Sequence, residues 1–476
     1  MNMKAPRGYL MLLAIVFGAI FLTVLGALSS YVLTENKLQN AGHAQARALS
    51  IAEAGLEYYR WFLAHYPNDL QNGTGVAGPY SIPYNDPEGG ETGTISLAIT
   101  GNTACGQVTS IDITSTGTAN GSPSATRAVF ARYAQPSVAR YSYILNDSVW
   151  AGSDRIINGP YHSNGGIHMD GTANAPVTSS VSSWNCTSGS GGYGCSPASS
   201  TASGVLGSGP NQDLWSWPVP QIDFAGIAAD FGTLKTLAQA QGIYYPRWST
   251  TNNPNAAAYW HGYHLIFNSN GTVTVRRTSA TTQLNVTPVN NADGTTDRAL
   301  INNETNYETR TIPVACGLIF VEDHVWIEGT IPQKVTVIAA NVVNAGIAPN
   351  VYLKNNIVYG ASDGTDGLTV IAEHNVLVTP DSPNTMTLNG IFVAQDGAFG
   401  RNYYGGSYDP RSTLTILGTT VSNKRTGTKW CLNGSCSSYG GYNTRIDSYD
   451  RRLANDPPPF TPLVSTDYEF VEWREK

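Results

Sequence analysis

Carboxyl and imidazole side chains are concentrated in one short segment, VEDHVWIEG. Its candidate acid–base residues are Glu322, Asp323, His324 and Glu328. Two carboxyl groups at a suitable separation can protonate a glycosidic oxygen and activate water. Alternation along an extended strand would place Glu322 and His324 on one face and Asp323 on the other. No nucleophile elbow, phosphate loop or cofactor fingerprint accompanies them. We therefore expect no catalytic residue and no cofactor, and a tethered carbohydrate-active enzyme is the least favoured function.

Histidine pairs and aspartate-rich loops are the candidate metal ligands. The pairs in YHSNGGIH and WHGYH lack the convergent third and fourth ligands that a zinc site requires. The loops NNADGTTD and SDGTDG place oxygen atoms beside glycines, as calcium prefers, but neither has the spacing of an EF-hand. We expect these loops to be solvated turns and the chain to hold no metal.

The six cysteines are too few to make this a disulfide-scaffolded chain. Two local disulfides are expected in an oxidising compartment, Cys186–Cys195 and Cys431–Cys436. Reduced thiols or a zinc site are the alternatives, and the absence of CxxC spacing disfavours zinc. Cys105 and Cys316 have no obvious partner in the sequence, so a bond between them stays open.

Aromatic side chains are dense in two nearby segments, PNQDLWSWPVP and YYPRWSTTNNPNAAAYWHGYH. Exposed aromatic rings can stack on sugar rings. The candidate ligand-binding residues are therefore Trp215, Trp217, Trp248 and Trp260. The alternative is that these rings pack in the core or against a helix.

The overall charge disfavours a nucleic-acid partner. The formal net charge is -7, and only 13% of the residues are charged. Binding through phosphate contacts requires the opposite balance. With 49 glycines and 26 tyrosines, the composition favours many short strands joined by turns.

An uncharged stretch long enough to cross a bilayer begins almost at the N-terminus. Lys4 and Arg7 precede it, and the next charged residue is Glu35. Behind it, apolar or small residues recur at steps of three and four until Pro67 limits the helix. The pattern predicts one helix over residues 9–66, apolar on all sides at first and amphipathic later.

Residues 67–140 predict a small antiparallel sheet that packs on the amphipathic half of this helix. Its three expected strands are TISLAIT, VTSIDITSTGTA and ATRAVFARYA. The predicted fold class is thus mainly β with a long N-terminal α-helix.

From residue 141 to 421, short β-branched runs alternate with asparagine and glycine, and each run is about one solenoid rung long. This favours a parallel β-solenoid-like domain, with asparagines stacked between coils. A β-sandwich is the alternative, because the period is not fixed. A helical insertion is expected over 223–241, with Asp223 as its N-cap, and residues 422–476 form a C-terminal strap.

The leader 1–8, the aromatic Tyr9, the apolar stretch behind it and the segment ALSIAEAGLEYYRWFL together resemble the type IV pilin and pseudopilin superfamily. The segment is similar to the AxxAAEAGLE element of its PilX-like minor pilins. The resemblance implies cleavage by a prepilin peptidase between Gly8 and Tyr9. It also implies that an assembly helix carries the residues Leu13, Glu35, Ala52, Glu53 and Glu57.

Leu13 departs from the family pattern, because most major pilins carry a glutamate at this fifth mature position. That carboxylate is thought to pair with the N-terminal amine of a neighbouring subunit. The resemblance therefore implies a minor or tip subunit rather than the body of a filament.

Together these observations predict a structural minor pilin or pseudopilin of a type IV pilus or a type II secretion filament. The expected partners are other pilins, a prepilin peptidase, the inner membrane before assembly, and a surface glycan or host ligand, with no nucleic acid. The expected location is the inner membrane and then a cell-surface filament. A surface-anchored adhesin or glycan-binding module is the alternative.

Overall fold

The computed structural model describes residues 9–67, 69–121, 123–188, 191–343, 346–433 and 436–476. The chain divides into two compact units. The helix–sheet unit comprises Met1–Gly101, Ile111–Tyr133 and Glu472–Lys476. The ladder unit comprises Asn102–Ser110 and Ala134–Val471. The last five residues therefore belong to the helix–sheet unit, whereas the sequence predicts that they end a separate strap.

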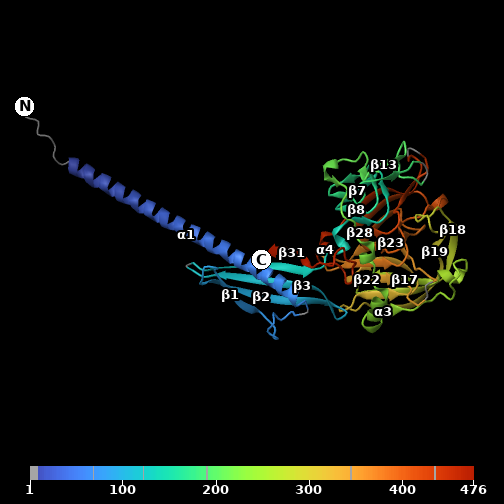
Figure 1. Ribbon diagram of the computed structural model, residues 1–476, viewed down its shortest axis with the longest axis horizontal. Helices are drawn as coiled ribbons and strands as arrows, with labels where there is room; N and C mark the ends of the chain where they lie inside the picture. The colour runs from blue at the N-terminus through green and yellow to red at the C-terminus, as the bar shows by residue number, and fades with distance from the viewer. Residues whose placement is uncertain (1–8, 68, 122, 189–190, 344–345, 434–435) are drawn as a thin grey trace, which may run out of the picture. The chain divides into compact units, whose positions relative to one another are not determined.

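Helix α1 (Tyr9–His65) is one continuous helix of 57 residues, shown in blue in Figure 1. At 1.5 Å per residue it is about 85 Å long. It is long and apolar enough to cross a membrane, with a mean hydropathy of 2.7 in its most apolar window. The buried residues of α1 all lie at or after Ala48. The first half is thus exposed, and the second half has a packed face.

A five-stranded sheet with the order β1-β2-β3-β4-β31 completes the helix–sheet unit. The strands are β1 (Tyr80–Asn85), β2 (Glu91–Ala104), β3 (Gln107–Ala119), β4 (Ala125–Ala134) and β31 (Glu469–Glu475). The pairs β1–β2 and β3–β4 are antiparallel. Strands β2, β3 and β4 contain the three expected segments, whereas the sequence did not predict β1 or the return of β31 to this sheet.

Small residues bring α1 into direct contact with β3. A Cβ atom added to Gly117 would lie 2.2 Å from the carbonyl oxygen of Ala48 and 2.4 Å from the nitrogen of Ala52. A Cβ atom added to Gly55 would lie 2.2 Å from Oγ of Ser115. The small residues of the segment ALSIAEAGLE are therefore required by the close approach of helix and sheet.

Short strands of the ladder unit pair in parallel, one after another, in a long ladder of ten strands. In spatial order these are β16 (Ile243–Tyr245), β20 (Leu318–Val321), β22 (Lys334–Ala339), β24 (Gly367–Ala372), β26 (Thr385–Ala394), β28 (Arg411–Ser422), β5 (Tyr143–Leu145), β8 (Tyr161–Ser163), β11 (Val177–Ser179) and β15 (Trp215–Ser216). Buried aliphatic side chains from these strands supply much of the core.

Three shorter parallel ladders run beside the long one. The first joins β17 (Gly262–Asn268), β21 (His324–Ile331), β23 (Val351–Tyr359), β25 (Val376–Val378) and β27 (Phe399–Gly400). The second joins β26 and β28 to β30 (Tyr439–Ser448), β7 (Arg155–Asn158) and β10 (Thr172–Ala173). The third joins β6 (Val149–Ala151), β9 (Ile167–Met169) and β14 (Val205–Leu206).

Antiparallel hairpins are attached to these ladders, so the large sheet is mixed. They are β17–β18 (Thr272–Asn285), β18–β19 (Thr296–Thr311) and β29 (Lys429–Cys431) with β30. Strands β12 (Ser183–Cys186) and β13 (Ser199–Ser203) form a separate antiparallel pair.

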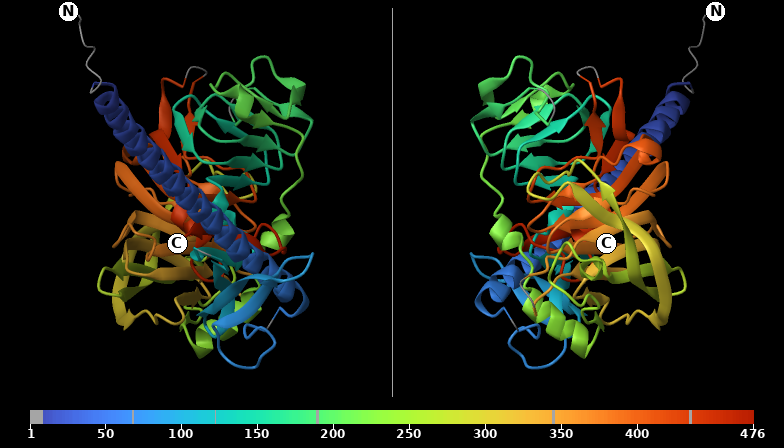
Figure 2. Two further views of the ribbon diagram at one scale, coloured as in Figure 1. Left: turned by 90° about the vertical axis from the view of Figure 1, so that its left-hand side faces the viewer. Right: turned by 90° about the vertical axis from the view of Figure 1, so that its right-hand side faces the viewer.

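The chain enters the long ladder in its middle. Residues 143–145 pair with 420–422, and the chain then passes outward through β8 and β11 to β15. It next crosses to β16 at the opposite end of the ladder and returns strand by strand to β28. Figure 2 shows the teal and green strands of 143–216 beside the red strands near the C-terminus.

The crossing segment contains two short helices, α2 (Phe224–Ile227) and α3 (Phe231–Ala240), where the sequence predicts one insertion helix. The side chain of Asp223 caps α2, as expected. Asp230 caps α3 by accepting a hydrogen bond from the backbone nitrogen of Thr233. A second N-cap inside the predicted helix explains the break, because an N-cap residue has non-helical backbone angles.

Asparagine side chains join successive strands at the corners of the ladders. Asn423, Asn146 and Asn164 each follow a strand of the long ladder directly. Asn146 donates a hydrogen bond of 2.7 Å to Asn423, and Asn164 donates one of 2.8 Å to Asn146. The amide of Asn350 likewise accepts from the backbone nitrogen of Asn375. These bonds satisfy polar groups where the backbone turns between strands.

Candidate functional site

The exposed apolar half of α1 is the first candidate site. Tyr9 begins the helix and is 76% exposed, and Leu13 is 56% exposed. Glu35, Glu53 and Glu57 are also exposed, and Glu57 pairs with Arg60 one turn away. These four positions beyond Tyr9 are thus accessible to other molecules. Gly8, the residue before the predicted cleavage site, lies outside the described residues, as does the rest of the leader.

Ala52 differs from the other predicted assembly residues, because it is fully buried against the sheet of its own unit. Its small side chain is needed where α1 approaches Gly117. The structure therefore gives Ala52 a packing role within the subunit.

The four candidate tryptophans fall into two groups at opposite ends of the long ladder. Trp215 is in β15, the last strand at one end, while Trp248 follows β16 at the other end by three residues. Nine strand spacings of about 4.8 Å separate these ends by about 40 Å. The tryptophans therefore do not form one aromatic row.

Packing accounts for most of these rings. Trp215 packs on the core around β5 and β8, and Trp217, at 39%, is the most exposed of the four. The guanidinium carbon of Arg277 lies 4.5 Å from the ring centre of Trp248, and Trp260 stacks on buried His324 at 5.0 Å. Of the four, Trp217 alone remains broadly accessible.

The acidic segment VEDHVWIEG is bent at its first carboxylates. Strand β20 ends at Val321 and β21 begins at His324, so the predicted alternation across Glu322 and Asp323 is wrong. The turn lets Asp323 accept hydrogen bonds from the backbone nitrogens of Trp248, Ser249 and His324.

Each candidate acid or base in this segment has a structural environment of its own. Glu322 accepts hydrogen bonds of 2.6 Å from both Lys235 and Tyr244. Burial raises the pKa of Asp323 to about 6, although backbone hydrogen bonds act against it. Burial also lowers the pKa of His324 to about 3, so this imidazole is neutral at physiological pH.

His264 is the centre of a buried charge cluster with two glutamates. Its Nδ1 lies 2.8 Å from Glu304, and its Nε2 lies 3.0 Å from Glu328. Arg276 also donates to Glu304, at 2.6 Å. Burial lowers the pKa of His264, but the two carboxylates outweigh it and the pKa is raised overall. The two glutamates therefore stabilise the positively charged form of the His264 imidazole inside the protein.

Two of the aspartates expected in solvated turns are buried. Asp297 accepts hydrogen bonds from Asn402 and Tyr404, and Asp366 accepts from the backbone nitrogen of Ala361. The expectation was wrong for these two residues, because protein donors replace water around their oxygens. Asp363 is exposed, as a solvated turn residue would be.

Three disulfides are present, and together they include all six cysteines. Cys186–Cys195 and Cys431–Cys436 close local segments. The third, Cys105–Cys316, joins residues 211 positions apart and ties the β2–β3 turn to the rest of the ladder unit. His168 lies close to the sulfurs of Cys186 and Cys195. Because these sulfurs are bonded to each other, they are not thiolates that could bind a metal.

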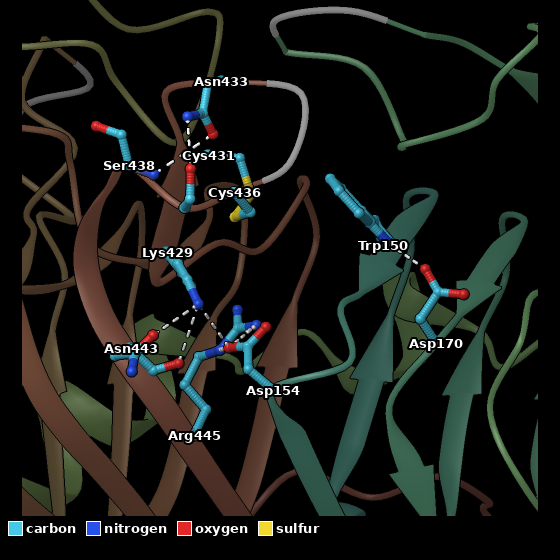
Figure 3. Close-up of a disulfide and its surroundings, with 11 residues drawn as sticks. Trp150, Asp154, Asp170, Lys429, Cys431, Asn433, Cys436, Ser438, Asn443 and Arg445 are labelled. Carbon is cyan, nitrogen blue, oxygen red and sulfur yellow. Dashed lines mark hydrogen bonds and ion pairs between the residues drawn. A yellow bond between two sulfur atoms is a disulfide. The ribbon is translucent and has the colours of Figure 1, made fainter.

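A cavity of about 410 Å³ lies beside the Cys431–Cys436 disulfide in the ladder unit. Its lining includes the turn between β6 and β7, the glycines 191 and 192, and strand β29. Figure 3 shows Trp150 on a teal strand and Asp154 in the turn that follows it, with Lys429 and Arg445 on the brown strands. Asp154 accepts a hydrogen bond of 2.9 Å from Arg445 and lies 3.4 Å from the Lys429 ammonium.

Comparisons with known proteins find distant structural likeness and no match in sequence. No protein-family model matches the chain, and no curated protein matches it. Among solved structures, the chain is similar to the competence-associated pilin ComZ from Thermus thermophilus. The identity is 13%, the match covers 91% of this chain and 97% of that chain, and the TM-score is 0.32. A TM-score this low carries no argument about this chain.

Of the residues that line the cavity, the sequence pointed to Cys431 and Cys436 but not to the charged side chains. Trp150, Asp154, Lys429 and Arg445 come from segments almost 300 residues apart, which meet because β30 pairs with β7. The local signal was the pair of short cysteine loops, since both loops contribute lining residues.

Proposed function

We propose that this chain is a pilin-like structural subunit of a cell-surface filament. The observation that supports this most strongly is α1 itself, a continuous helix with an exposed apolar first half and a second half packed on its own sheet. In this proposal the first half sits in the inner membrane before assembly and then packs among the helices of other pilins. The ladder unit is displayed outside the cell.

The energetics of α1 require an apolar environment. Among the described residues, eighteen large apolar side chains between Tyr9 and Leu38 are exposed. At about 1.5 kcal/mol or more for each side chain that becomes fully buried, covering them stabilises the helix by more than about 20 kcal/mol. That exceeds the usual stability of a folded domain, about 5–15 kcal/mol. Such a surface is suited to lipid and then to neighbouring helices.

The proposal further makes this chain a minor or terminal subunit, whether in a type IV pilus or in a type II secretion filament. Leu13 cannot form the ion pair that a glutamate would offer to the N-terminal amine of a neighbour. The ladder unit contains most of the chain, and a body of that size would crowd a helically repeating shaft. Both features favour a subunit that occurs rarely along the filament or lies at its tip.

For the ladder unit we propose a β-solenoid-like architecture rather than a β-sandwich. The parallel pairings of the ten-strand ladder support it, because the sheets of a sandwich are antiparallel. The asparagine bonds between successive corners also support it. The proposed role is structural and not catalytic, and the acids of VEDHVWIEG already have protein partners.

Processing at the leader tests the proposal. Co-expression with a prepilin peptidase should yield a mature chain whose N-terminus, measured by mass spectrometry, is Tyr9. The Gly8→Leu variant alters only the residue before the expected cut and should stay full-length. A wild-type chain that keeps Met1, while a known prepilin in the same cells is cleaved, would contradict the proposal. Labelling of the ladder unit should then place it at filament ends.

A further inference from the structure

We infer that the cavity beside the Cys431–Cys436 disulfide binds an acidic sugar, that is, a saccharide ring carrying a carboxylate. This inference goes beyond the proposed filament role and holds whether or not the chain is assembled. It rests on the size, charge balance and aromatic lining of the cavity.

The cavity has the dimensions of a small-molecule site. Its volume of about 410 Å³ is within the usual range of roughly 300–1,000 Å³ for ligand pockets. Both short disulfide loops contribute to its lining, through Gly191 and Gly192 on one side and through Cys431 and Cys436 on the other. Covalently closed loops lose little freedom when a ligand binds, which favours binding.

The lining carries more positive than negative charge. Its ionisable residues are Asp154, Arg155, Arg425, Lys429 and Arg445. Arg155 is matched by Asp447, outside the lining, at 2.7 Å, and both of these side chains are almost fully buried. Four cations against the carboxylates of Asp154, Asp447 and Asp147, the last of which acts on Arg425, leave a local charge of about +1. This is a local reversal in a chain whose net charge is -7.

One carboxylate is shared between two of these cations. Asp154 contacts both Arg445 and Lys429. Arg425 instead donates to the backbone carbonyls of Gly191 and Gly192, which carry no formal charge. Lys429 also donates to the backbone and amide oxygens of Asn443, so a further anion would replace one of these bonds, whereas Arg425 has no carboxylate bonded to it in the described residues.

The environment of these cations makes an additional anion favourable. Burial lowers the pKa of Lys429 and of Arg445, and the attraction of Asp154 does not fully compensate. Burial also lowers the pKa of Arg425, although Tyr193 and Asp147 act against it. A carboxylate placed among them would stabilise their charged forms.

Aromatic rings give the cavity faces that suit a sugar. Trp150, Tyr403 and Trp430 belong to the lining. The indole nitrogen of Trp150 donates to Asp170 at 2.9 Å, and that of Trp430 donates to the carbonyl of Arg401 at 2.8 Å. These bonds fix the orientation of both rings before a ligand arrives. Trp150 stacks on His168 at a centroid distance of 5.8 Å and packs against Gly194, so the rings offered to a sugar are those of Tyr403 and Trp430. Their apolar surfaces beside charged donors match the C–H faces and the carboxylate of a uronic acid.

The arrangement of the cations disfavours a nucleic acid. Binding along a phosphate backbone requires a groove of cations that follows the strand. Here the cations converge on one cavity, and the overall charge of the chain would repel a polyanion of that length.

Titration of the full-length chain in detergent micelles tests the inference. The probes are trigalacturonate and its methyl ester, in which a methyl group removes the charge of each carboxyl group, and binding is measured by calorimetry. We expect the ester to bind at least about tenfold more weakly, because charge-assisted hydrogen bonds are lost. Raising the salt from about 0.05 to about 0.5 M should weaken binding of the acid and leave the ester almost unchanged.

Two variants locate the site, and a third serves as control. Lys429→Gln and Arg425→Gln should each weaken trigalacturonate binding about tenfold or more. Lys424→Gln removes an exposed charge outside the lining and should bind as the wild type does. Thermal unfolding identifies a variant that fails to fold. In that case the other cavity variant and the comparison of acid with ester test the inference.

The opposite results are equally clear. The inference is overturned if trigalacturonate does not bind, if acid and ester bind equally, or if both cavity variants keep wild-type affinity. Tighter binding of a single-stranded oligonucleotide than of trigalacturonate would also overturn it. Cleavage at Tyr9 is measured separately, so failure here leaves the filament proposal intact, and the reverse also holds.

Discussion

The buried ionisable side chains of the ladder unit include some that are matched by an opposite charge and some that burial holds neutral. Arg155 with Asp447 and His264 with Glu304 belong to the first kind. His324 belongs to the second, because burial lowers its pKa to about 3. Three cations of the cavity, Arg425, Lys429 and Arg445, fit neither kind fully, which distinguishes the cavity from purely structural charge clusters.

The His264 cluster should make stability depend on pH through Glu304. Burial alone would raise the pKa of Glu304, but hydrogen bonds from His264 and Arg276 hold it at about 2, below its ordinary 4.5. A depressed carboxyl pKa stabilises the folded state above about pH 4.5, and this contribution disappears as the pH falls through about 2. Glu304→Gln should therefore lower the free energy of unfolding by about 1–3 kcal/mol at pH 6 and by almost nothing near pH 2.

Denaturant unfolding at a series of pH values measures this difference. Glu88→Gln, at an exposed turn between β1 and β2, is the control and should change little at any pH. A Glu304→Gln deficit that stays constant from about pH 6 to about pH 2 would show that shape and not charge explains the loss.

Elements formed from local sequence patterns could be predicted, and those that depend on distant pairing could not. The helix from residue 9 and the three strands within β2, β3 and β4 follow from periodicity alone. The break between α2 and α3 was missed because a second N-cap, Asp230, outweighed helical periodicity. The turn at Glu322 and Asp323 was missed because backbone donors from the segment after β16 hold Asp323.

The packing of α1 on β3 predicts a strong effect of adding one carbon atom. In Gly117→Ala, the new Cβ would overlap the backbone of Ala48 and Ala52, so helix and sheet must move apart. Overpacking of this kind lowers the free energy of unfolding by about 1–3 kcal/mol. Gly42→Ala is the matched control, because nothing lies within 4 Å of its added Cβ.

Unfolding of both variants in the same detergent gives the comparison. The control should be unchanged or more stable by up to about 1 kcal/mol, since alanine favours helix more than glycine does. Equal stability of Gly117→Ala and wild type would mean that α1 does not lie this close to β3.

The long-range disulfide, Cys105–Cys316, should stabilise the fold more than the local disulfide Cys431–Cys436 does. In the chain-entropy estimate, closing a loop of 211 residues stabilises by about 5 kcal/mol, against about 2 kcal/mol for a loop of 5. Replacing Cys105 and Cys316 by serine should therefore lower the unfolding temperature more than replacing Cys431 and Cys436. Thermal unfolding without reductant compares the two double variants. If the two double variants lost equal stability, or if the variant without Cys431–Cys436 lost more, the stabilisation would not depend on loop length.

At the scale of the whole molecule, the order of strands in the ladder could not be derived from the sequence. The chain enters the ladder in the middle, so strands 275 or more residues apart become neighbours, as β5 and β28 do. The periodicity of the sequence around each strand carries no information about which distant strand it pairs with. The same pairing brings β7 next to β30 and creates the charged cavity, so the site follows from the topology. The predicted aromatic site was built from sequence proximity, and the ladder divides it between two ends.

The apolar half of α1 makes a final prediction, about where the whole chain resides. Phe17→Asp with Phe21→Asp places two charges in the uncharged stretch, and each charge near the centre of a membrane helix costs about 2.5–3.5 kcal/mol. We expect the double variant to leave the membrane fraction on alkaline extraction, whereas wild type stays. Gln39→Asp with Gln45→Asp adds the same two charges to exposed positions beyond that stretch and should be retained. Equal retention of all three proteins would mean that α1 is not what holds this chain in the membrane.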